Sequence, residues 1–173
     1  MGEKEIGIYA SGTLSKDEFV KFNVFHRRRF SVIVSIFVPL YYFITNDYNF
    51  SLNFIISIPF LLIFILLLII MSKILFKYSA RKQYDSDPLA KLERKYKITK
   101  SGINEQMIGK SQIDIEWVDI KKSFELDNLF VLYLSNRSAV LIPKCFFQSK
   151  EDISLFKEIA NENLKTKMKR KFI

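Results

Sequence analysis

The sequence of 173 residues contains one cysteine, one histidine and only five glycines. A single cysteine excludes an intrachain disulfide, and one cysteine with one histidine cannot supply a zinc site of ordinary ligand spacing. The scarcity of glycine leaves little room for a loop that cradles phosphate groups. Charge is also missing from one region, because residues 30–72 hold no charged side chain apart from Asp47. The sequence therefore predicts a protein without metal or cofactor, and it predicts that this region is apolar.

Two uncharged stretches make up the apolar region. Residues 30–45 form a helix of ~24 Å if they are helical, slightly short of a hydrocarbon core of ~30 Å. Residues 48–72 are 25 uncharged residues and are long enough to cross it. The alternative is a buried helix of a soluble core, but a chain of this length has little else with which to bury one. We therefore expect two transmembrane helices.

The positions of the basic residues predict how these helices are oriented. Residues 46–51 are too few for anything but a tight connection, so we expect a helical hairpin with both chain termini on one side. Lysine and arginine concentrate on the cytoplasmic flank of membrane helices, which places both termini in the cytoplasm. The flanking cations, which are also candidate contacts for lipid headgroups, are Arg27, Arg28, Arg29, Lys73, Lys77, Arg81 and Lys82.

Local patterns divide the chain into four parts. A capping box of Ser15 and Glu18 predicts a helix that continues into the first apolar stretch, preceded by one short strand. The second helix is expected to stop at Asp87-Pro88, because proline disfavours helix at the residue before it. The expected parts are an N-terminal strand and helix (1–29), the transmembrane hairpin (30–72), a juxtamembrane helix and linker (73–89) and a cytoplasmic domain (90–173).

Residues 90–173 change from helical to β-type periodicity. Short runs of alternating apolar and polar residues are separated by turns at spacings typical of an antiparallel meander. A helix follows, with Ser149 as its N-cap. Its apolar stripe, expected to pack on the sheet, consists of Ile153, Phe156, Ile159 and Ala160. The predicted fold class is therefore a membrane α-helical hairpin joined to an α+β domain.

Several short motifs in this domain resemble those of the YcxB-like family of bacterial membrane proteins. They are Tyr96-x-Ile98-x-x-x-Gly102, Ile115-x-Trp117-x-Asp119-Ile120, the strand over residues 129–134, and Ile142-Pro143-Lys144 followed by Phe146 or Phe147. The resemblance implies a pleckstrin-homology-like (PH-like) fold, which is a bent antiparallel sheet closed by a C-terminal helix. It also marks Gly102, Trp117, Asp119, Pro143 and Lys144 as structural motif residues. In a bacterial cell, the topology expected from the basic residues places the protein in the inner membrane. The resemblance supplies no catalytic residues.

Catalytic chemistry has little support in the sequence. Cys145 and His26 are the only candidates for a nucleophile and its base, and they lie on opposite sides of the apolar region in the chain. A thiol next to Lys144 is expected to have a lowered pKa. The simpler interpretation is that Cys145 ends a strand, and we predict that the protein is not an enzyme.

The C-terminus carries the densest positive charge. Its five cations are Lys165, Lys167, Lys169, Arg170 and Lys171. Near an anionic leaflet each contributes about 1 kcal/mol, so five give on the order of 5 kcal/mol. We expect contact with anionic lipid headgroups, with a solvated helix end as the alternative. Nucleic acid is a weaker candidate because no groove-reading motif is present.

These features lead to a functional expectation. We expect a membrane-tethered, non-catalytic module that binds a protein or peptide partner through a sheet edge or through the open end of the bent sheet. By analogy of fold, its most concrete form is self-immunity against a bacteriocin or toxin. The alternative is an accessory subunit of an envelope transport, secretion or stress-response assembly.

Overall fold

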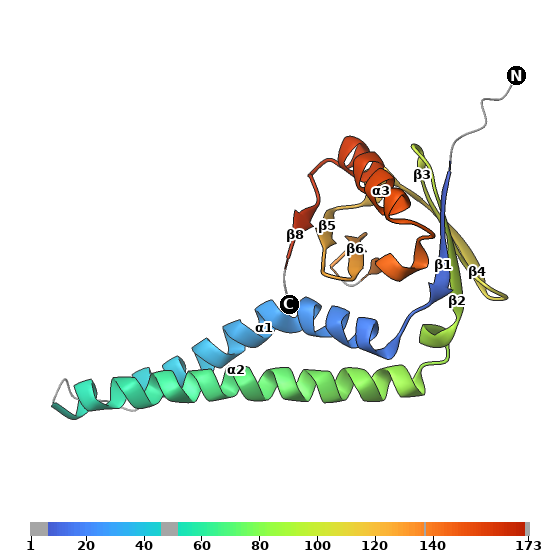
Figure 1. Ribbon diagram of the computed structural model, residues 1–173. Helices are drawn as coiled ribbons and strands as arrows, with labels where there is room; N and C mark the ends of the chain where they lie inside the picture. Colours follow the sequence, from blue (N-terminus) through green and yellow to red (C-terminus); the bar gives the residue numbers. More distant parts are fainter. Residues whose placement is uncertain (1–6, 46–51, 137, 172–173) are drawn as a thin grey trace, which may run out of the picture. The chain divides into compact units, whose positions relative to one another are not determined.

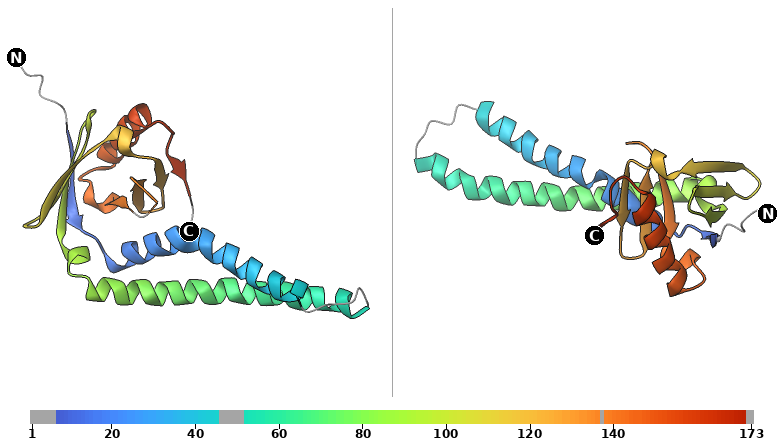
Figure 2. Two further views of the ribbon diagram at one scale, coloured as in Figure 1. Left: turned by 180° about the vertical axis from the view of Figure 1, so that it is seen from behind. Right: turned by 90° about the horizontal axis from the view of Figure 1, so that it is seen from above.

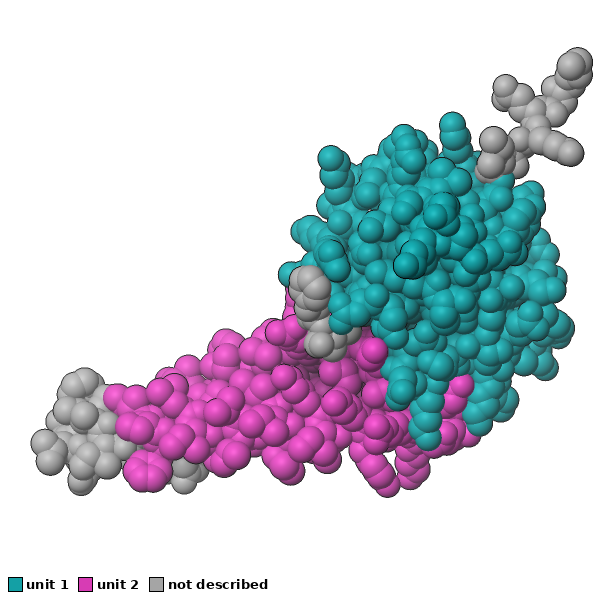
Figure 3. Space-filling model, in the orientation of Figure 1, with its two compact units in different colours: residues 1–18, 87–173 teal, residues 19–86 magenta. Residues whose placement is uncertain are grey.

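The computed structural model describes residues 7–45, 52–136 and 138–171. The chain divides into two compact units, shown in Figure 3. The mixed unit combines residues 1–18 with residues 87–173, and the helical unit comprises residues 19–86. The mixed unit is therefore built from two parts of the chain that are far apart in sequence, so its fold depends on long-range pairing.

The helical unit consists of two long helices, α1 (Lys16–Thr45) and α2 (Leu52–Ser86). At the start of α1, the Ser15 amide donates to Glu18 Oε2 at 2.9 Å and the Glu18 amide donates to Ser15 Oγ at 3.3 Å. This reciprocal pattern confirms the predicted capping box. The end of α2 just before Asp87-Pro88 is likewise as predicted. The expected link over residues 46–51 lies outside the described residues.

Helices α1 and α2 contact one another in antiparallel order. The rings of Phe19 and Tyr84 have centroids 5.6 Å apart, and further along the pair the hydroxyls of Ser31 and Ser72 are hydrogen-bonded. Between these contacts lies a small apolar cluster of Val20, Val24 and Ala80, with Phe76 packed against it. Residue numbers rise along one helix as they fall along the other, which is the order expected of a helical hairpin.

One described helix is long and apolar enough to cross a membrane, judged by length and composition alone. It is the part of α2 over Ile58–Ser86, and none of its most apolar 18-residue window is buried. Phe60 and Leu62 are 69% and 61% exposed, whereas the core helix of a soluble protein buries such residues. No second described helix meets the same criterion. A helix of this kind indicates association with a membrane.

The mixed unit contains two four-stranded sheets (Figures 1 and 2). The first has the order β1-β2-β3-β4 and the second the order β7-β6-β5-β8. All neighbouring strands are antiparallel except β5 and β8, which are parallel. The strands are β1 (Ile8–Thr13), β2 (Glu93–Ile98), β3 (Gly102–Met107), β4 (Ser111–Glu116), β5 (Lys122–Glu125), β6 (Leu129–Tyr133), β7 (Ala139–Pro143) and β8 (Lys169–Arg170).

Helix α3 (Lys150–Asn163) packs on the inner faces of both sheets. Ser149 Oγ accepts a hydrogen bond from the Asp152 amide at 3.0 Å, which confirms the predicted N-cap. Phe156, Ile159 and Ala160 are buried, as their stripe predicted, and they share one core with inner residues of the two sheets. Three short 3-10 helices complete the unit, over Leu89–Lys91, Trp117–Asp119 and Lys144–Phe146.

The register of the first sheet explains its buried face. One row across its four strands is Ile8, Ile98, Ile103 and Ile115, all at most 4% exposed. Strand residues alternate between the two faces, so the next row, which starts at Tyr9, lies on the outer face. Four β-branched side chains in one row form the inner layer of the core.

The α+β class predicted from sequence is confirmed, but the sheet arrangement differs from the single meander expected for residues 90–173. Strand β1 precedes both helices in the chain and pairs with β2, and the remaining strands form two sheets. Two of the C-terminal cations, Lys169 and Arg170, form strand β8, which pairs in parallel with β5. Neither pairing has a local signal in the sequence, because each joins segments separated by more than 40 residues.

Candidate functional site

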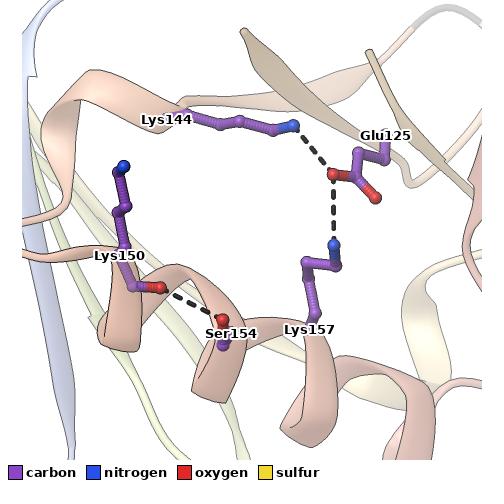
Figure 4. Close-up of polar contacts among 5 residues, drawn as sticks. All are labelled: Glu125, Lys144, Lys150, Ser154 and Lys157. Atoms are coloured by element: carbon purple, nitrogen blue, oxygen red, sulfur yellow. Dashed lines mark hydrogen bonds and ion pairs between the residues drawn. The ribbon is translucent and has the colours of Figure 1, made fainter. Parts of the chain in front are cut away.

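Two ion pairs of the mixed unit meet at Glu125. Its Oε1 atom lies 2.7 Å from Lys144 Nζ and 3.3 Å from Lys157 Nζ, as drawn in Figure 4. One carboxylate oxygen therefore accepts hydrogen bonds from two ammonium groups. The Glu125 and Lys144 side chains are only 12% and 20% exposed, so this ion pair is shielded from water more than ordinary surface pairs are, whereas the Lys157 side chain is 41% exposed.

Three separate elements bring these groups together. Glu125 is the last residue of β5, Lys144 opens the 3-10 helix after β7, and Lys157 lies in α3. The Lys144 amide donates to the Asn128 carbonyl at 2.9 Å, and its ammonium group lies 5.2 Å from the centre of the Phe130 ring. The backbone bond and the cation–π contact both orient Lys144 toward the carboxylate.

The environment of Glu125 changes its acidity. Burial is the largest influence and favours the neutral acid, but the hydrogen bonds and charges of Lys144 and Lys157 together outweigh it and lower the pKa of Glu125. The carboxylate is consequently ionised at neutral pH. It compensates part of the positive charge that surrounds it.

Helix α3 sorts its exposed charges onto two faces. Lys150, Ser154, Lys157 and Asn161 repeat at helical spacing and form a stripe with no acidic member. A second stripe, one residue further around, consists of Glu151, Glu158 and Glu162. The basic stripe is the one that reaches Glu125, through Lys157. Figure 4 shows Lys150 on the same side of the helix, with its side chain extended toward the segment that carries Lys144.

The C-terminal cations are held beside this site by backbone pairing. Arg170 is the register partner of Glu125, and the Lys171 amide donates to the Glu125 carbonyl at 2.9 Å. Met168 packs against the core, and its amide donates to Asn161 Oδ1 at 3.0 Å. The five predicted cations of this segment are all exposed: Lys165, Lys167, Lys169, Arg170 and Lys171.

We call Lys144, Lys150, Lys157 and Arg170 the cationic cluster, with Glu125 as its internal carboxylate. Partners in register project from the same face of a sheet, so Arg170 projects from the same face as Glu125. The three lysines, set against one carboxylate, leave a positive excess around Glu125. Such an arrangement attracts anions, and its ammonium and guanidinium donors suit carboxylate or phosphate oxygens.

The remaining predicted cations belong to the helical unit. The Arg27 guanidinium lies 5.6 Å from the centre of the Phe76 ring, so the antiparallel contact brings Arg27 of α1 to the level of Lys77 on α2. Six further cations are exposed: Arg28, Arg29, Lys73, Lys77, Arg81 and Lys82. Two groups of basic residues that are about 50 residues apart in the chain thus share one level of the helix pair.

The other motif residues occupy structural positions. Trp117 is 4% exposed, and its indole N–H donates to the Thr99 carbonyl at 3.0 Å. A Cβ atom on Gly102 would lie 2.3 Å from the Ile115 carbonyl oxygen, so only glycine fits between β3 and β4. Pro143 is buried at the end of β7, whereas Asp119 is exposed.

Cys145 does not have the properties of an activated nucleophile. Burial raises the pKa of its thiol, and the charge of Glu18, whose Oε1 lies 3.5 Å from Sγ, raises it further. The expectation that Lys144 lowers this pKa was wrong, because the Lys144 ammonium group is directed to Glu125. His26 lies on α1 with its ring stacked on Phe22 at 5.7 Å.

A second polar network joins the two sheets. The Tyr96 hydroxyl lies 3.0 Å from Glu105 Oε1 and 3.0 Å from the Leu141 carbonyl oxygen. Arg94 pairs with the same Glu105 oxygen at 3.1 Å. Burial, followed by the charge of Glu105, raises the pKa of Tyr96 far above its usual range. The tyrosine therefore stays neutral and acts as a hydrogen-bond donor between the sheets.

Sequence reasoning did not single out Glu125, Lys150 or Lys157. The contacts of Glu125 span 19 and 32 residues, and nothing local marks a glutamate at the end of a strand as a partner for distant lysines. The sequence does show that Lys150 and Lys157 lie on one helical face, but this spacing is equally typical of a solvated helix surface and does not indicate a binding site.

Comparison with known proteins gives the chain its family. The family described as "YcxB-like protein" matches residues 98–160. The uncharacterized protein YcxB of Bacillus subtilis (strain 168) is 32% identical over 121 residues, which cover 69% of this chain and 60% of that protein. A solved structure of the Spt16D Pob3N heterodimer shares 13% identity over 49% of each chain, with a TM-score of 0.39. By the match over residues 98–160 and the identity to YcxB, the chain belongs to the YcxB-like family.

Proposed function

We propose that this protein is a membrane-tethered, non-catalytic binding or regulatory module. The helical unit is its anchor and the mixed unit its binding domain. The observation that carries the proposal is the exposed apolar window of α2, none of which is buried. An apolar surface of that extent facing water would cause aggregation, whereas in hydrocarbon it is the favoured surface.

We further propose that α1 crosses the membrane beside α2. Phe30 and Phe37 of α1 are 67% and 64% exposed, which suits contact with lipid chains. Ser31 and Ser35 are instead buried, and Ser31 bonds to Ser72 of α2. Small hydroxyl residues that pair between helices are typical of transmembrane packing. These contacts support a two-span hairpin.

The basic residues support one orientation for that hairpin. Arg27 and Lys77 lie at one level of the helix pair, next to the apolar parts of both helices. The positive-inside rule assigns this level to the cytoplasmic side. We therefore propose that both termini and the mixed unit face the cytoplasm at the bacterial inner membrane.

We propose that the mixed unit is a variant of the PH-like fold. Support comes from two mostly antiparallel sheets that share one core, with α3 covering their inner faces. A PH-like fold is likewise a bent antiparallel sheet that is closed by a C-terminal helix. Its binding role would use exposed strand edges or charged surfaces, since Cys145 has a raised thiol pKa that disfavours covalent chemistry.

The anionic inner leaflet is the proposed lipid partner. The cations of the helical unit and the five C-terminal cations are exposed, apart from the partly exposed Arg27, and each contributes about 1 kcal/mol near an anionic surface. The further partner is a protein or peptide. Self-immunity against a bacteriocin or toxin is the form we favour, and membership of an envelope assembly is the competing outcome of the partner experiment below.

Cysteine labelling tests the topology. In a Cys145→Ser background, Asn49→Cys and Thr166→Cys are treated on whole cells with a thiol reagent that does not cross membranes. We expect Asn49→Cys to be labelled on intact cells and Thr166→Cys only after permeabilisation, because the first lies between the proposed spans and the second in the proposed cytoplasmic unit. Labelling of Thr166→Cys on intact cells would contradict the orientation. Release of the chain into the supernatant by alkaline carbonate would contradict the anchor.

Co-purification tests the partner. The full chain is cross-linked in its native membrane, extracted in mild detergent, and the bound proteins are identified by mass spectrometry. A short cationic hydrophobic peptide would support immunity, and a transport or secretion subunit would support the assembly. A Cys145→Ser variant serves as the control for covalent chemistry, and we expect it to retain the same partners.

A further inference from the structure

Glu125 leaves the hydrogen-bonding capacity of the cationic cluster largely unused. Lys144 and Lys157 both donate to the single atom Glu125 Oε1, and each ammonium group has more N–H donors than the one bond it makes there. Lys150 has no ion-pair partner among the described residues, and its side chain extends toward the segment of Lys144 (Figure 4). The three lysines of the cluster therefore hold unused donors and uncompensated charge.

The backbone of three elements positions the members of the cluster. Lys144 is fixed by its backbone bond to Asn128 and by the Phe130 ring. Lys150 and Lys157 share the acid-free stripe of α3, and Arg170 is fixed in register with Glu125 by the β5–β8 pairing. Cations that project from ordered backbone elements lose less conformational entropy on binding a ligand than the cations of a disordered tail do.

A phosphate group matches these properties better than a carboxylate does. It offers several acceptor oxygens in a tetrahedral arrangement, and in the dianionic form it balances more of the positive excess. Glu125 supplies a single oxygen at the same place. It acts as an internal anion that holds the lysines in position.

We propose that the cationic cluster of Lys144, Lys150, Lys157 and Arg170 is a binding site for a terminal phosphate group that can carry two negative charges, with Glu125 as the competing internal anion. The group has two possible sources, the headgroup of an acidic phospholipid and free phosphate. The site goes beyond the proposed membrane anchor, because it depends on the mixed unit alone.

Titration of the full chain tests the site. The protein is reconstituted into nanodiscs of phosphatidylcholine, and calorimetry follows the addition of inorganic phosphate, dihexanoyl phosphatidic acid and dihexanoyl phosphatidylglycerol at constant ionic strength. We expect saturable binding of phosphate, phosphatidic acid or both, and weaker binding of the phosphodiester. Binding of both probes identifies the phosphate group itself as the ligand, and binding of phosphatidic acid alone identifies the headgroup.

Charge-matched variants distinguish a specific phosphate site from non-specific electrostatic attraction between the anion and the protein. Lys144→Gln with Lys157→Gln should weaken binding at least about tenfold, since each charge-assisted bond lost is worth that much. The control pair, Lys95→Gln with Lys97→Gln, removes the same charge from exposed positions on the outer face of the first sheet. It should leave the affinity within about twofold. Equal losses in both pairs would overturn the proposal.

Glu125→Gln should change the affinity for phosphate in the opposite direction from the lysine substitutions. Removal of the competing carboxylate should strengthen phosphate binding by about three- to tenfold, because the ligand no longer displaces an internal anion. Weaker or unchanged binding would overturn the competition. Should the double lysine variant fail to fold, Lys150→Gln removes a cation without an ion pair and should weaken binding several-fold with unchanged Trp117 emission. Alkaline extraction of every variant tests the anchor separately, so failure of the site and failure of the anchor are distinguishable.

Discussion

Tyr96→Phe tests whether the two sheets are joined by the buried hydroxyl. Tyr96 is 1% exposed, and its hydroxyl lies 3.0 Å from both Glu105 Oε1 and the Leu141 carbonyl oxygen. The substitution keeps the ring and removes only this oxygen. Glu105 retains Arg94 at 3.1 Å, so the loss is one buried O–H donor whose single proton is shared between a partly neutralised carboxylate and a carbonyl oxygen. We expect the free energy of unfolding to fall by about 2 kcal/mol.

Urea unfolding of the full chain in detergent micelles measures this loss. Trp117 is the single tryptophan and is buried in the mixed unit, so its emission reports the unfolding of that unit. With a urea slope of about 2 kcal/mol per molar, the loss shifts the midpoint down by about 1 M.

Tyr9→Phe is the matched control. Tyr9 lies on the outer face of the same sheet and is 59% exposed, so the same chemical change there should shift the midpoint by less than about 0.25 M. Two results would refute the reasoning: an unchanged midpoint for Tyr96→Phe, or equal shifts for the two tyrosines.

Three further substitutions follow from the same structure. The lysine partners of Glu125 lower its pKa, so its contribution to stability is complete above the unfolded value of 4.5 and is lost as the pH falls through the lower folded-state pKa. The difference in unfolding free energy between the wild type and Glu125→Gln should therefore shrink as the pH is lowered from about 6 to about 3. Gly102→Ala places a Cβ atom 2.3 Å from the Ile115 carbonyl oxygen and should destabilise the mixed unit by about 1–3 kcal/mol in the urea assay. Ser149→Ala removes the N-cap bond to the Asp152 amide and should cost about 1 kcal/mol, whereas Ser154→Ala, on the exposed side of α3, should cost less than half of that.

Features governed by neighbours in the chain were predictable from sequence. The Ser15–Glu18 capping box and the Ser149 cap depend on residues three apart, and both have the predicted hydrogen bonds. The inner stripe of α3 follows from helical periodicity, whereas the alternation expected in β4 holds only in part, because Ile115 is buried and Ile113 is 44% exposed. For the caps and the stripe, one local rule decides the structure.

Features governed by distant residues were not predictable. Strand β1 pairs with β2 across both long helices, so the turn signals within residues 90–173 contain no trace of it. Strand β8 has two residues, Lys169 and Arg170, and neither has the apolar alternation that marks a strand. The Glu125 site depends on this pairing and on lysines from two other elements, so it arises only from the tertiary structure.

The pairing of β8 changes what the C-terminal charge can do. A loose polybasic segment binds any anionic surface, because its strength follows from the number of charges alone. Here Met168 is packed against the core and the backbone of Arg170 is paired with that of Glu125, so the cations project from a fixed backbone. Fixed cations lose less entropy on binding and discriminate by geometry between a tetrahedral phosphate and a diffuse anionic surface. The internal carboxylate strengthens that discrimination, since a ligand that uses the remaining N–H donors of Lys144 and Lys157 still competes with Glu125 for their positive charge.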